Sequence, residues 1–346
     1  MGEVYLEEQF LQLVQIMEQM QKRMIEIENN NQILVNSNHQ LINWMDMIEK
    51  DVIVLKNNMK YELLDPRIQN QDIWHPVIIS YEKTLELLVK EGKSISRFGD
   101  CEFTTIKGEV RHKFQTDVDM ELANRLKEVL NSTEENLLVA IADNYGDLSK
   151  YTDNAQREIR YYMIEEVRSS HLQLLQKGRE YYDAYISRPY AMYRDNNTDG
   201  PQKRFDALKQ LWQGKKCVFV EGDKTRMGVG NDLFAGAESI QRILAPAENA
   251  FRSYEEILAE CLKMPKDRMF ILALGPTASV LAYDLCKAGY QALDLGHVDL
   301  EYEWFIRGQG GRTAIANKYN NELPDGEKVE EVFDEEYLKQ IVVRIS

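Results

Sequence analysis

The sequence predicts an α/β fold in which a mostly parallel sheet is flanked by helices and preceded by a long N-terminal coiled-coil helix. Residues 1–60 contain a single glycine and no proline, and their apolar residues recur with a seven-residue period. A repeat sustained for this length is typical of a coiled coil. From about residue 70, short apolar runs alternate with helical stretches, which favours βαβ units.

Two apolar lines, each with steps of seven residues, make up the N-terminal repeat between Leu6 and Met59. Fourteen of its sixteen seam positions are apolar, and the exceptions are Asn31 and Asn38 at consecutive a positions. A buried asparagine at this position pairs with its counterpart across a parallel two-stranded seam. We therefore expect a parallel homodimer through residues 6–59. The alternative is a single amphipathic helix folded onto its own globular domain.

The coiled coil is expected to end near Pro66, because proline disfavours helical geometry in the residue before it. This divides the chain into a coiled coil, residues 1–65, and an α/β domain, residues 66–346. Apolar runs in this domain predict strands over residues 93–98, 137–141, 217–221, 239–244, 269–274 and 291–295. Runs with a helical period predict helices over residues 73–91, 119–131, 154–176, 254–263 and 276–288. A helix and then a strand are expected in the last dozen residues.

Charge and cysteine content narrow the functional classes. The net charge is −15, and nonspecific binding to nucleic acid or to an anionic membrane needs a cationic face. The sequence has no apolar run of about 18 residues that would predict a transmembrane segment, and its acidic N-terminus does not resemble a signal peptide. The four cysteines form no CxxC pair, so we expect reduced thiols in a cytoplasmic protein.

Asp100 and Glu102 directly follow the expected strand 93–98. Two carboxylates two residues apart at a strand end can bind one divalent cation, because hard cations prefer oxygen ligands. A solvated acidic turn is the alternative, since the chain has 57 acidic residues. Ligands of parallel sheets bind outside the carboxyl ends of the strands, so this is one candidate site.

The sequence EGDKTRMGVGNDLF, residues 221–234, follows the expected strand 217–221. Backbone N–H groups of glycine turns, together with Lys224 and Arg226, can cradle an anion. The spacing matches neither a Walker A motif nor a dinucleotide-binding motif. Three further candidates lie in the same loop, namely Gly228, Asn231 and Asp232.

Two more strand ends carry candidate residues. Gly275 and Thr277 lie where a strand is expected to turn into a helix N-terminus, which suits a phosphate or carboxylate. The alternative is an ordinary helix start with Thr277 as its N-cap. His297, Asp299 and Glu301 follow the last expected strand, and such side chains can supply a base or a metal ligand. As isolated residues, each of these is more often structural.

Together these segments resemble one known family, the bacterial GT-D-type glycosyltransferases, which are best known from glycosylation of serine-rich-repeat adhesins. The resemblance extends from about residue 75 to about residue 310 and leaves out the coiled coil. The segments that carry it read RFGDCEF, ISRPY, EGDKTRMGVGNDLF, LAPAENAF, LALGPTASVLAYDL and DLGHVDLEYEWF. It implies a Rossmann-like fold distinct from the two commoner glycosyltransferase folds. It also implies a UDP-sugar donor, typically UDP-glucose, and a divalent metal on an Asp-x-Glu motif.

Asp100 and Glu102 match that motif, so the resemblance implies that they hold Mn²⁺ or Mg²⁺ against the donor diphosphate. The middle residue of the motif is usually glycine in the family, and here it is Cys101. If this position requires positive φ, a cysteine is strained there. The residues expected to contact the donor are Arg97, Lys224, Arg226, Gly228, Asn231, Asp232, Gly275 and Thr277.

The sequence thus predicts a UDP-sugar-dependent hexosyltransferase that acts on a glycan of a surface glycoprotein or on a polysaccharide precursor. Lys224 or Arg226 is expected to stabilise the leaving UDP together with the metal. A carboxylate of Asp299 or Glu301 is expected to act as general base, with His297 as the alternative. Two other functions stay open: a non-catalytic coiled-coil scaffold subunit of a glycosyltransferase complex, and another nucleotide-phosphate enzyme such as a phosphotransferase.

Overall fold

The structure is a computed structural model that describes residues 2–59, 74–110, 113–308, 312–320, 323, 326–330 and 334–346, and only the backbone of residues 2–14. It divides into two compact units, Met1–Met59 and Lys60–Ser346. The expected boundary between residues 65 and 66 lies outside the described residues. None of the described helices combines the length and the apolarity needed to cross a bilayer.

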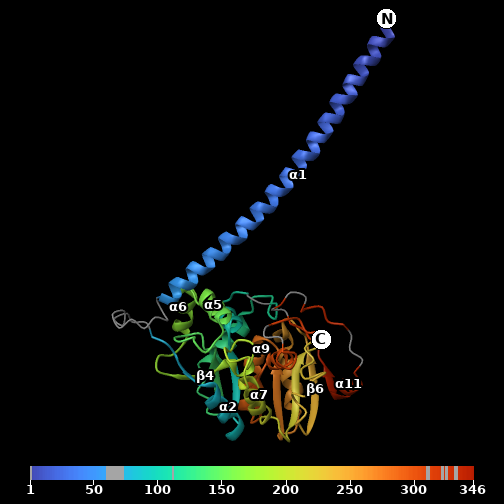
Figure 1. Ribbon diagram of the computed structural model, residues 1–346. Coiled ribbons are helices and arrows are strands. Elements are labelled where there is room, and N and C mark those ends of the chain that lie inside the picture. Colours follow the sequence, from blue (N-terminus) through green and yellow to red (C-terminus); the bar gives the residue numbers. More distant parts are fainter. Residues whose placement is uncertain are drawn as a thin grey trace. The chain divides into compact units, whose positions relative to one another are not determined.

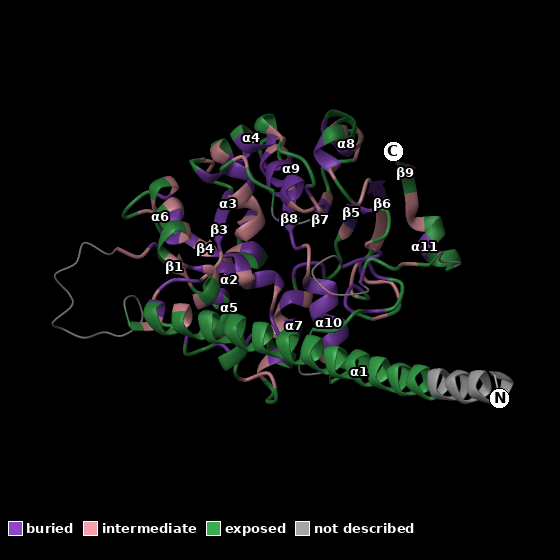
Figure 2. Cartoon of the chain, turned by 90° about the horizontal axis from the view of Figure 1, so that it is seen from above, coloured by how far each residue is buried: buried purple, intermediate pink, exposed green. Residues whose placement is uncertain are grey.

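The first unit is one unbroken helix, α1 (Gly2–Asn57), of 56 residues (Figure 1). At about 1.5 Å per residue it is roughly 80 Å long. Its described side chains are exposed along nearly the whole helix (Figure 2). The long N-terminal helix that the seven-residue repeat predicts is therefore confirmed.

The second unit contains one nine-stranded sheet with the order β1-β4-β3-β2-β8-β7-β5-β6-β9, in which every neighbouring pair is parallel. All six expected strands are confirmed, and so is the strand near the C-terminus. The strands are β1 (Val77–Ile79), β2 (Ser94–Phe98), β3 (Leu137–Ile141), β4 (Glu180–Asp183), β5 (Lys216–Gly222), β6 (Ser239–Ala245), β7 (Arg268–Ala273), β8 (Gln291–Asp294) and β9 (Ile341–Arg344).

Helices cover both faces of this sheet (Figure 2). Helices α3, α4, α8 and α9 pack in one apolar cluster, and α2, α7 and α10 pack in another. Successive residues of β5 alternate between the clusters, with Val218 in the first and Phe219 in the second. The helices are α2 (Tyr81–Lys90), α3 (Asp100–Ile106), α4 (Met120–Leu130), α5 (Asp153–Tyr162), α6 (Glu165–Leu174), α7 (Gly200–Lys209), α8 (Tyr254–Leu262), α9 (Pro276–Lys287), α10 (Val298–Ile306) and α11 (Glu335–Gln340), with short 3-10 turns at η2 (Ala184–Ser187) and η3 (Ala250–Ser253).

The helix expected over residues 73–91 is wrong in its first part, where β1 precedes α2. Pro76 has no N–H to donate within a helix, and the β-branched residues of β1 favour an extended backbone. Ser80 then begins α2, because its Oγ accepts the N–H of Lys83 at 3.3 Å.

The single helix expected over residues 154–176 is also wrong, because α5 and α6 occupy this stretch. Ile164, which separates them, has an extended backbone with φ −62° and ψ 167°. The neighbouring Met163 is completely buried, so the break allows its side chain to reach the core. Helix α10 was not expected, because apolar and acidic residues alternate along residues 298–304, which is the period of a strand and not of a helix.

Candidate functional site

The candidate segments all begin at the carboxyl edge of the sheet. They follow β2, β5, β7 and β8, which are adjacent in the order β2-β8-β7-β5. From β2 the chain continues toward β3 on one side, and from β5 it continues toward β6 on the other side. Such a reversal in strand order is where open α/β sheets bind ligands. The fold therefore brings the four segments to one edge.

Asp100 and Glu102 form the first turn of α3, so they do not lie in an acidic turn. The Oε2 atom of Glu102 accepts the N–H of Gly99 at 2.7 Å. Burial, together with the nearby carboxylate of Asp294, raises the pKa of Glu102 to about 7. Cys101 lies within the same helical turn and is not among the described residues with positive φ. The strain considered for this cysteine is therefore absent.

The chemistry of these two carboxylates fits a divalent cation. No cluster of three His, Cys, Asp or Glu side chains that could enclose an ion occurs in the described part of the chain. Mg²⁺ is commonly held by only one or two carboxylates, with water and substrate phosphates completing its shell. The raised pKa of Glu102 indicates that its negative charge is incompletely compensated. Asp100 and Glu102 thus suit an ion that binds together with a diphosphate.

Arg97, an expected donor contact, is bonded within the protein. Its Nη2 lies 2.8 Å from Oδ1 of Asp294, and its Nη1 donates to the Ser187 hydroxyl at 2.6 Å. These bonds join the ends of β2 and β8 to the turn η2 after β4. Asp294 and Ser187 were not predicted as site residues, although both lie in the segments that carried the family resemblance. Arg97 therefore fixes the relative positions of three strand ends.

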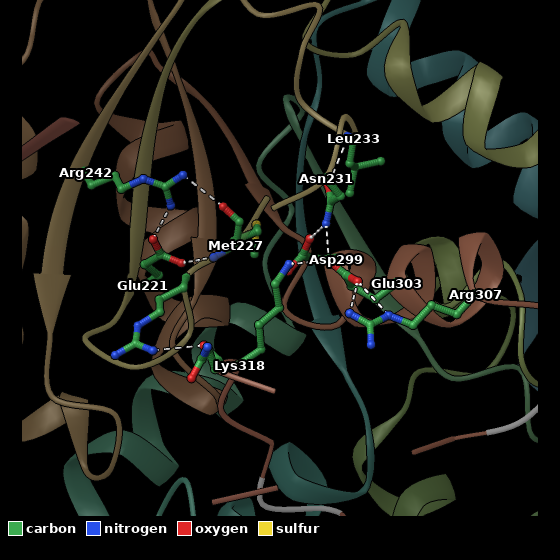
Figure 3. Close-up of polar contacts among 11 residues, drawn as sticks. Glu221, Met227, Asn231, Leu233, Arg242, Asp299, Glu303, Arg307 and Lys318 are labelled. Atoms are coloured by element: carbon green, nitrogen blue, oxygen red, sulfur yellow. Dashed lines mark hydrogen bonds and ion pairs between the residues drawn. The ribbon is translucent and has the colours of Figure 1, made fainter. Parts of the chain in front are cut away.

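The loop after β5 is held by a buried clamp, which we name the Met227 clamp and which consists of Glu221 and Arg242 (Figure 3). Oε2 of Glu221 accepts the N–H of Met227 at 2.7 Å, and Arg242 donates to the Met227 carbonyl at 2.9 Å. Glu221 and Arg242 also form an ion pair with each other. Burial raises the pKa of Glu221 despite this pairing. Both main-chain polar groups of Met227 are therefore fixed.

The two cationic candidates of this loop have different environments. The side chain of Lys224 is exposed, whereas Arg226 is buried and donates to the carbonyl of Asn317 at 3.1 Å. Arg226 also has a positive φ of 52°, which is uncommon for a residue other than glycine. At Gly228, φ is 76°, and a Cβ atom would lie 2.6 Å from the Phe234 ring. The shape of the loop thus depends on this glycine.

Asn231 and Asp232, both expected to contact the donor, bond to protein side chains. Nδ2 of Asn231 donates to Asp299 Oδ1 and to Glu303 Oε1, each at 2.8 Å (Figure 3). Asp232 accepts the hydroxyl of Tyr302 at 2.6 Å. These contacts join the loop after β5 to helix α10.

Of the three candidate bases, Asp299 and Glu301 are buried and bonded. Oδ2 of Asp299 lies 2.7 Å from Nζ of Lys318. Oε2 of Glu301 accepts the N–H groups of Tyr190 and Ala191 at 3.0 and 2.8 Å, and burial raises its pKa. His297 is partly exposed at the start of α10. Lys318 was not predicted as a site residue, because no motif marks its irregular segment.

The start of α9 lies against an aromatic side chain. Gly275, not Thr277, is the N-cap, with Pro276 as the first helical residue and Thr277 buried behind it. The N-cap role considered for Thr277 is therefore wrong. A Cβ atom on Gly275 would lie 2.8 Å from the Cβ of Phe114. Phe114 also packs edge-on to the ring of His297, with a centroid distance of 6.4 Å.

Comparison with known proteins agrees with this arrangement. A family model described as glycosyltransferase GT-D fold matches residues 95–323. The chain is 36% identical over 270 residues to the probable glycosyl transferase Gly of Streptococcus gordonii. It is 34% identical over 270 residues to glycosyltransferase GlyD of Streptococcus pneumoniae serotype 4. These alignments cover 78% and 76% of this chain but only 39% and 32% of the relatives, so the chain spans about a third of their length.

Solved structures are similar over the same region. One is described as the highly conserved domain of unknown function 1792 with a distinct glycosyltransferase fold. It has a TM-score of 0.71 and 37% identity, and the match covers 78% of this chain and 96% of that one. Another, described as a new glycosyltransferase (DUF1792) from Streptococcus sanguinis, has a TM-score of 0.73 and 36% identity. The match covers 79% of this chain and 100% of that one. The chain therefore belongs to the GT-D family of glycosyltransferases.

Proposed function

We propose that this glycosyltransferase transfers glucose from UDP-glucose to a glycan acceptor, with Mn²⁺ or Mg²⁺ bound at Asp100 and Glu102. The observation that carries the proposal is the carboxylate pair at the end of β2, on the same sheet edge as the cationic loop after β5. A sugar diphosphate needs oxygen ligands for its metal ion and a cationic donor for its phosphates. Both are available at this edge.

Each residue has a defined part in the proposed reaction. Asp100 and Glu102 hold the metal ion, which neutralises charge that develops on the leaving diphosphate. The exposed side chain of Lys224 binds a phosphate oxygen. Arg226 holds the loop through Asn317, and the Met227 clamp fixes its backbone. A loop that is already in position loses little freedom when the donor binds.

The acceptor hydroxyl must also lose a proton. The carboxylates of Asp299 and Glu301 already bond to Lys318 and to backbone N–H groups. The partly exposed His297 follows β8, the strand next to β2, which the Asp100–Glu102 motif follows. A Cβ atom on the neighbouring Gly296 would lie 3.2 Å from Nη2 of Arg97. We therefore assign the general base to His297, and we assign Asp299 and Glu301 to positioning the surrounding loops.

For the acceptor we propose a glycan on a surface glycoprotein or on a polysaccharide precursor, and for the place of reaction the cytoplasm. The four cysteines are all free thiols, which suits a reducing compartment. The protein partner that we propose is a second copy of this chain, bound through residues 6–59.

The test is release of UDP from UDP-glucose by the purified chain with Mn²⁺, with Mg²⁺ or with EDTA. Release that requires the metal and is lost in Asp100→Asn supports the proposal. If the chain binds UDP but forms no UDP from UDP-glucose in any of these conditions, the scaffold alternative is supported instead. Melting temperatures with UDP, ADP and GDP test the phosphotransferase alternative, because a ligand of the folded state raises the melting temperature. The proposal requires the largest rise with UDP.

A further inference from the structure

The two apolar lines of α1 are exposed to solvent in the single chain (Figure 2). From residue 17 to residue 59 they contain eleven apolar side chains, whose exposed fractions range from 52% for Leu41 to 70% for Met45. Proteins that act as monomers rarely expose an apolar surface that is continuous over such a length. The exposed lines therefore indicate a partner for α1.

We propose that this partner is a second copy of the chain and that the two α1 helices lie parallel and in register. The narrow a/d seam selects a helical partner with the same seven-residue period, and a second copy always has it. In this arrangement the two glycosyltransferase domains are attached at the same end of the paired helices. The inference goes beyond the transfer reaction and does not depend on it.

Asn31 and Asn38 support the parallel arrangement. In a parallel, in-register pair each a position faces the same position of the other copy, so each asparagine amide meets its counterpart. In an antiparallel pair a positions face d positions. At the antiparallel register with nearly complete overlap, Asn31 would face Ile27 and Asn38 would face Met20. Two asparagine amides of each chain would then be buried against apolar side chains, which is unfavourable.

The charges beside the seam support the same register. In a parallel pair, a residue at position g lies near position e of the other copy, five residues later. This places Arg23 beside Glu28 of the second copy and Asp51 beside Lys56. The seven g–e pairs from residues 9 and 14 to residues 51 and 56 include these two attractive pairs and no pair of like charges. Each attractive pair occurs twice in the dimer because of its symmetry.

The arrangement has a consequence for the acceptor. Two transferase domains at one end of the paired helices can act on neighbouring sites of one acceptor molecule. After the first domain binds, the second encounters its site at an effective concentration that is set by the linkage and not by the protein concentration in solution. The dimer thus suits an acceptor with many repeated glycosylation sites.

Disulfide cross-linking of the full chain tests orientation and register. Leu41→Cys places a thiol at a d position, which faces itself only in the parallel, in-register pair. We expect most chains of this variant to form covalent dimers on oxidation. Asn36→Cys, on the outer face of α1, and the unchanged chain serve as controls and should form few. A mixture of Met17→Cys and Leu41→Cys tests the antiparallel pair, in which these positions meet. Cross-links between the two variants, without links between Leu41→Cys chains, would overturn the proposal.

Exchange of charges tests the cross-chain ion pair. Arg23→Glu and Glu28→Arg each create like-charge pairs and should raise the dimer dissociation constant roughly tenfold, and the double variant should recover most of this loss. Sedimentation of the full chain gives the constants. A chain that sediments as a monomer at micromolar concentration, or a double variant weaker than either single variant, contradicts the proposed assembly. UDP release is expected to be unchanged throughout, which separates this result from the proposed reaction.

Discussion

Lys318 and Asp299 form a buried ion pair, with Nζ of Lys318 2.7 Å from Oδ2 of Asp299 and both side chains 5% exposed. The same ammonium group lies 2.9 Å from Glu303, and the amide of Asn231 donates to both acids. Segment 312–320 is thereby joined to the loop after β5 through two acids of α10 (Figure 3). The shape of the proposed donor site depends on this connection.

The first prediction follows from this ion pair. Lys318→Met should lower the free energy of unfolding by about 3–5 kcal/mol, because the buried carboxylate of Asp299 loses its cation and Glu303 keeps only its ion pair with Arg307. Urea unfolding measures the change. Adding Asp299→Asn should recover part of it, since the uncompensated charge of Asp299 is then removed. A Lys318→Met variant as stable as the natural chain would show that the pair adds nothing to the fold.

The second prediction concerns acid stability. Burial favours a higher pKa for Glu303, but hydrogen bonds from Asn231 and Lys318 hold it below its usual value of 4.5. A carboxylate whose pKa is lowered by folding stabilises the fold above its unfolded pKa, and this contribution is lost as the pH falls through the folded pKa. The free energy of unfolding should therefore fall on acidification below about pH 4.5. Glu303→Gln should show a smaller fall between pH 5 and pH 3.

The third prediction tests the Asp-x-Glu motif with a matched control. Glu102→Gln should abolish metal-dependent UDP release while leaving the far-ultraviolet circular dichroism unchanged, because the amide cannot supply the anionic oxygen that the metal needs. Glu109→Gln removes an exposed carboxylate just after the same helix and should retain full activity. Equal activity in both variants would mean that Glu102 only caps α3.

The fourth prediction compares two lysines at opposite ends of β5. Lys224→Ala should weaken UDP binding about ten- to a hundredfold, the usual effect of losing a charge-assisted hydrogen bond. Its stability should stay nearly unchanged, since the side chain is exposed. Lys215→Ala, at the amino end of the strand, should bind UDP normally. Isothermal titration gives both affinities, and similar losses in the two variants would indicate an effect of net charge alone.

The fifth prediction uses a buried aspartate outside the proposed reaction. Asp183 is fully buried at the end of β4, and its Oδ2 has no hydrogen-bond partner among the described residues. Burial and the carboxylate of Asp143 raise its pKa to about 7. The folded state then binds a proton that the unfolded state has lost, so this group reduces stability as the pH rises from about 4 to 7. Relative to the natural chain, Asp183→Asn should become more stable between pH 5 and pH 8. A constant difference in unfolding free energy across this range would contradict the raised pKa.

The central strands could be predicted because burial on both faces makes a strand a continuous apolar run. All five residues of β3 are buried, and their sequence is LLVAI. Helix α10 was missed for a different reason, because its seven buried residues alternate between apolar and acidic side chains. Periodicity therefore misleads where buried acidic side chains interrupt the apolar face of a helix.

The motifs placed the candidate residues on the correct strand ends but could not assign their contacts. Asp299 looked like a free base in the sequence, and its bond to Lys318 depends on an irregular segment that no pattern predicts. Phe114 lies against Gly275 because of tertiary packing, which local sequence does not encode. Backbone strain at Cys101 was considered because the sequence suggested a turn there, but Cys101 lies in helix α3.

The pairing of β2 with β8 has a consequence for the order of folding. The N–H of Ala292 donates to the hydroxyl of Ser94, 198 residues earlier in the chain. Contacts between such distant residues form slowly. During synthesis, β2 cannot pair with β8 until β8 has left the ribosome. Helix α1 needs only local bonds within its own 56 residues. The proposed pairing of two copies through α1 can therefore begin between neighbouring nascent chains on one messenger RNA, before either of their sheets is complete.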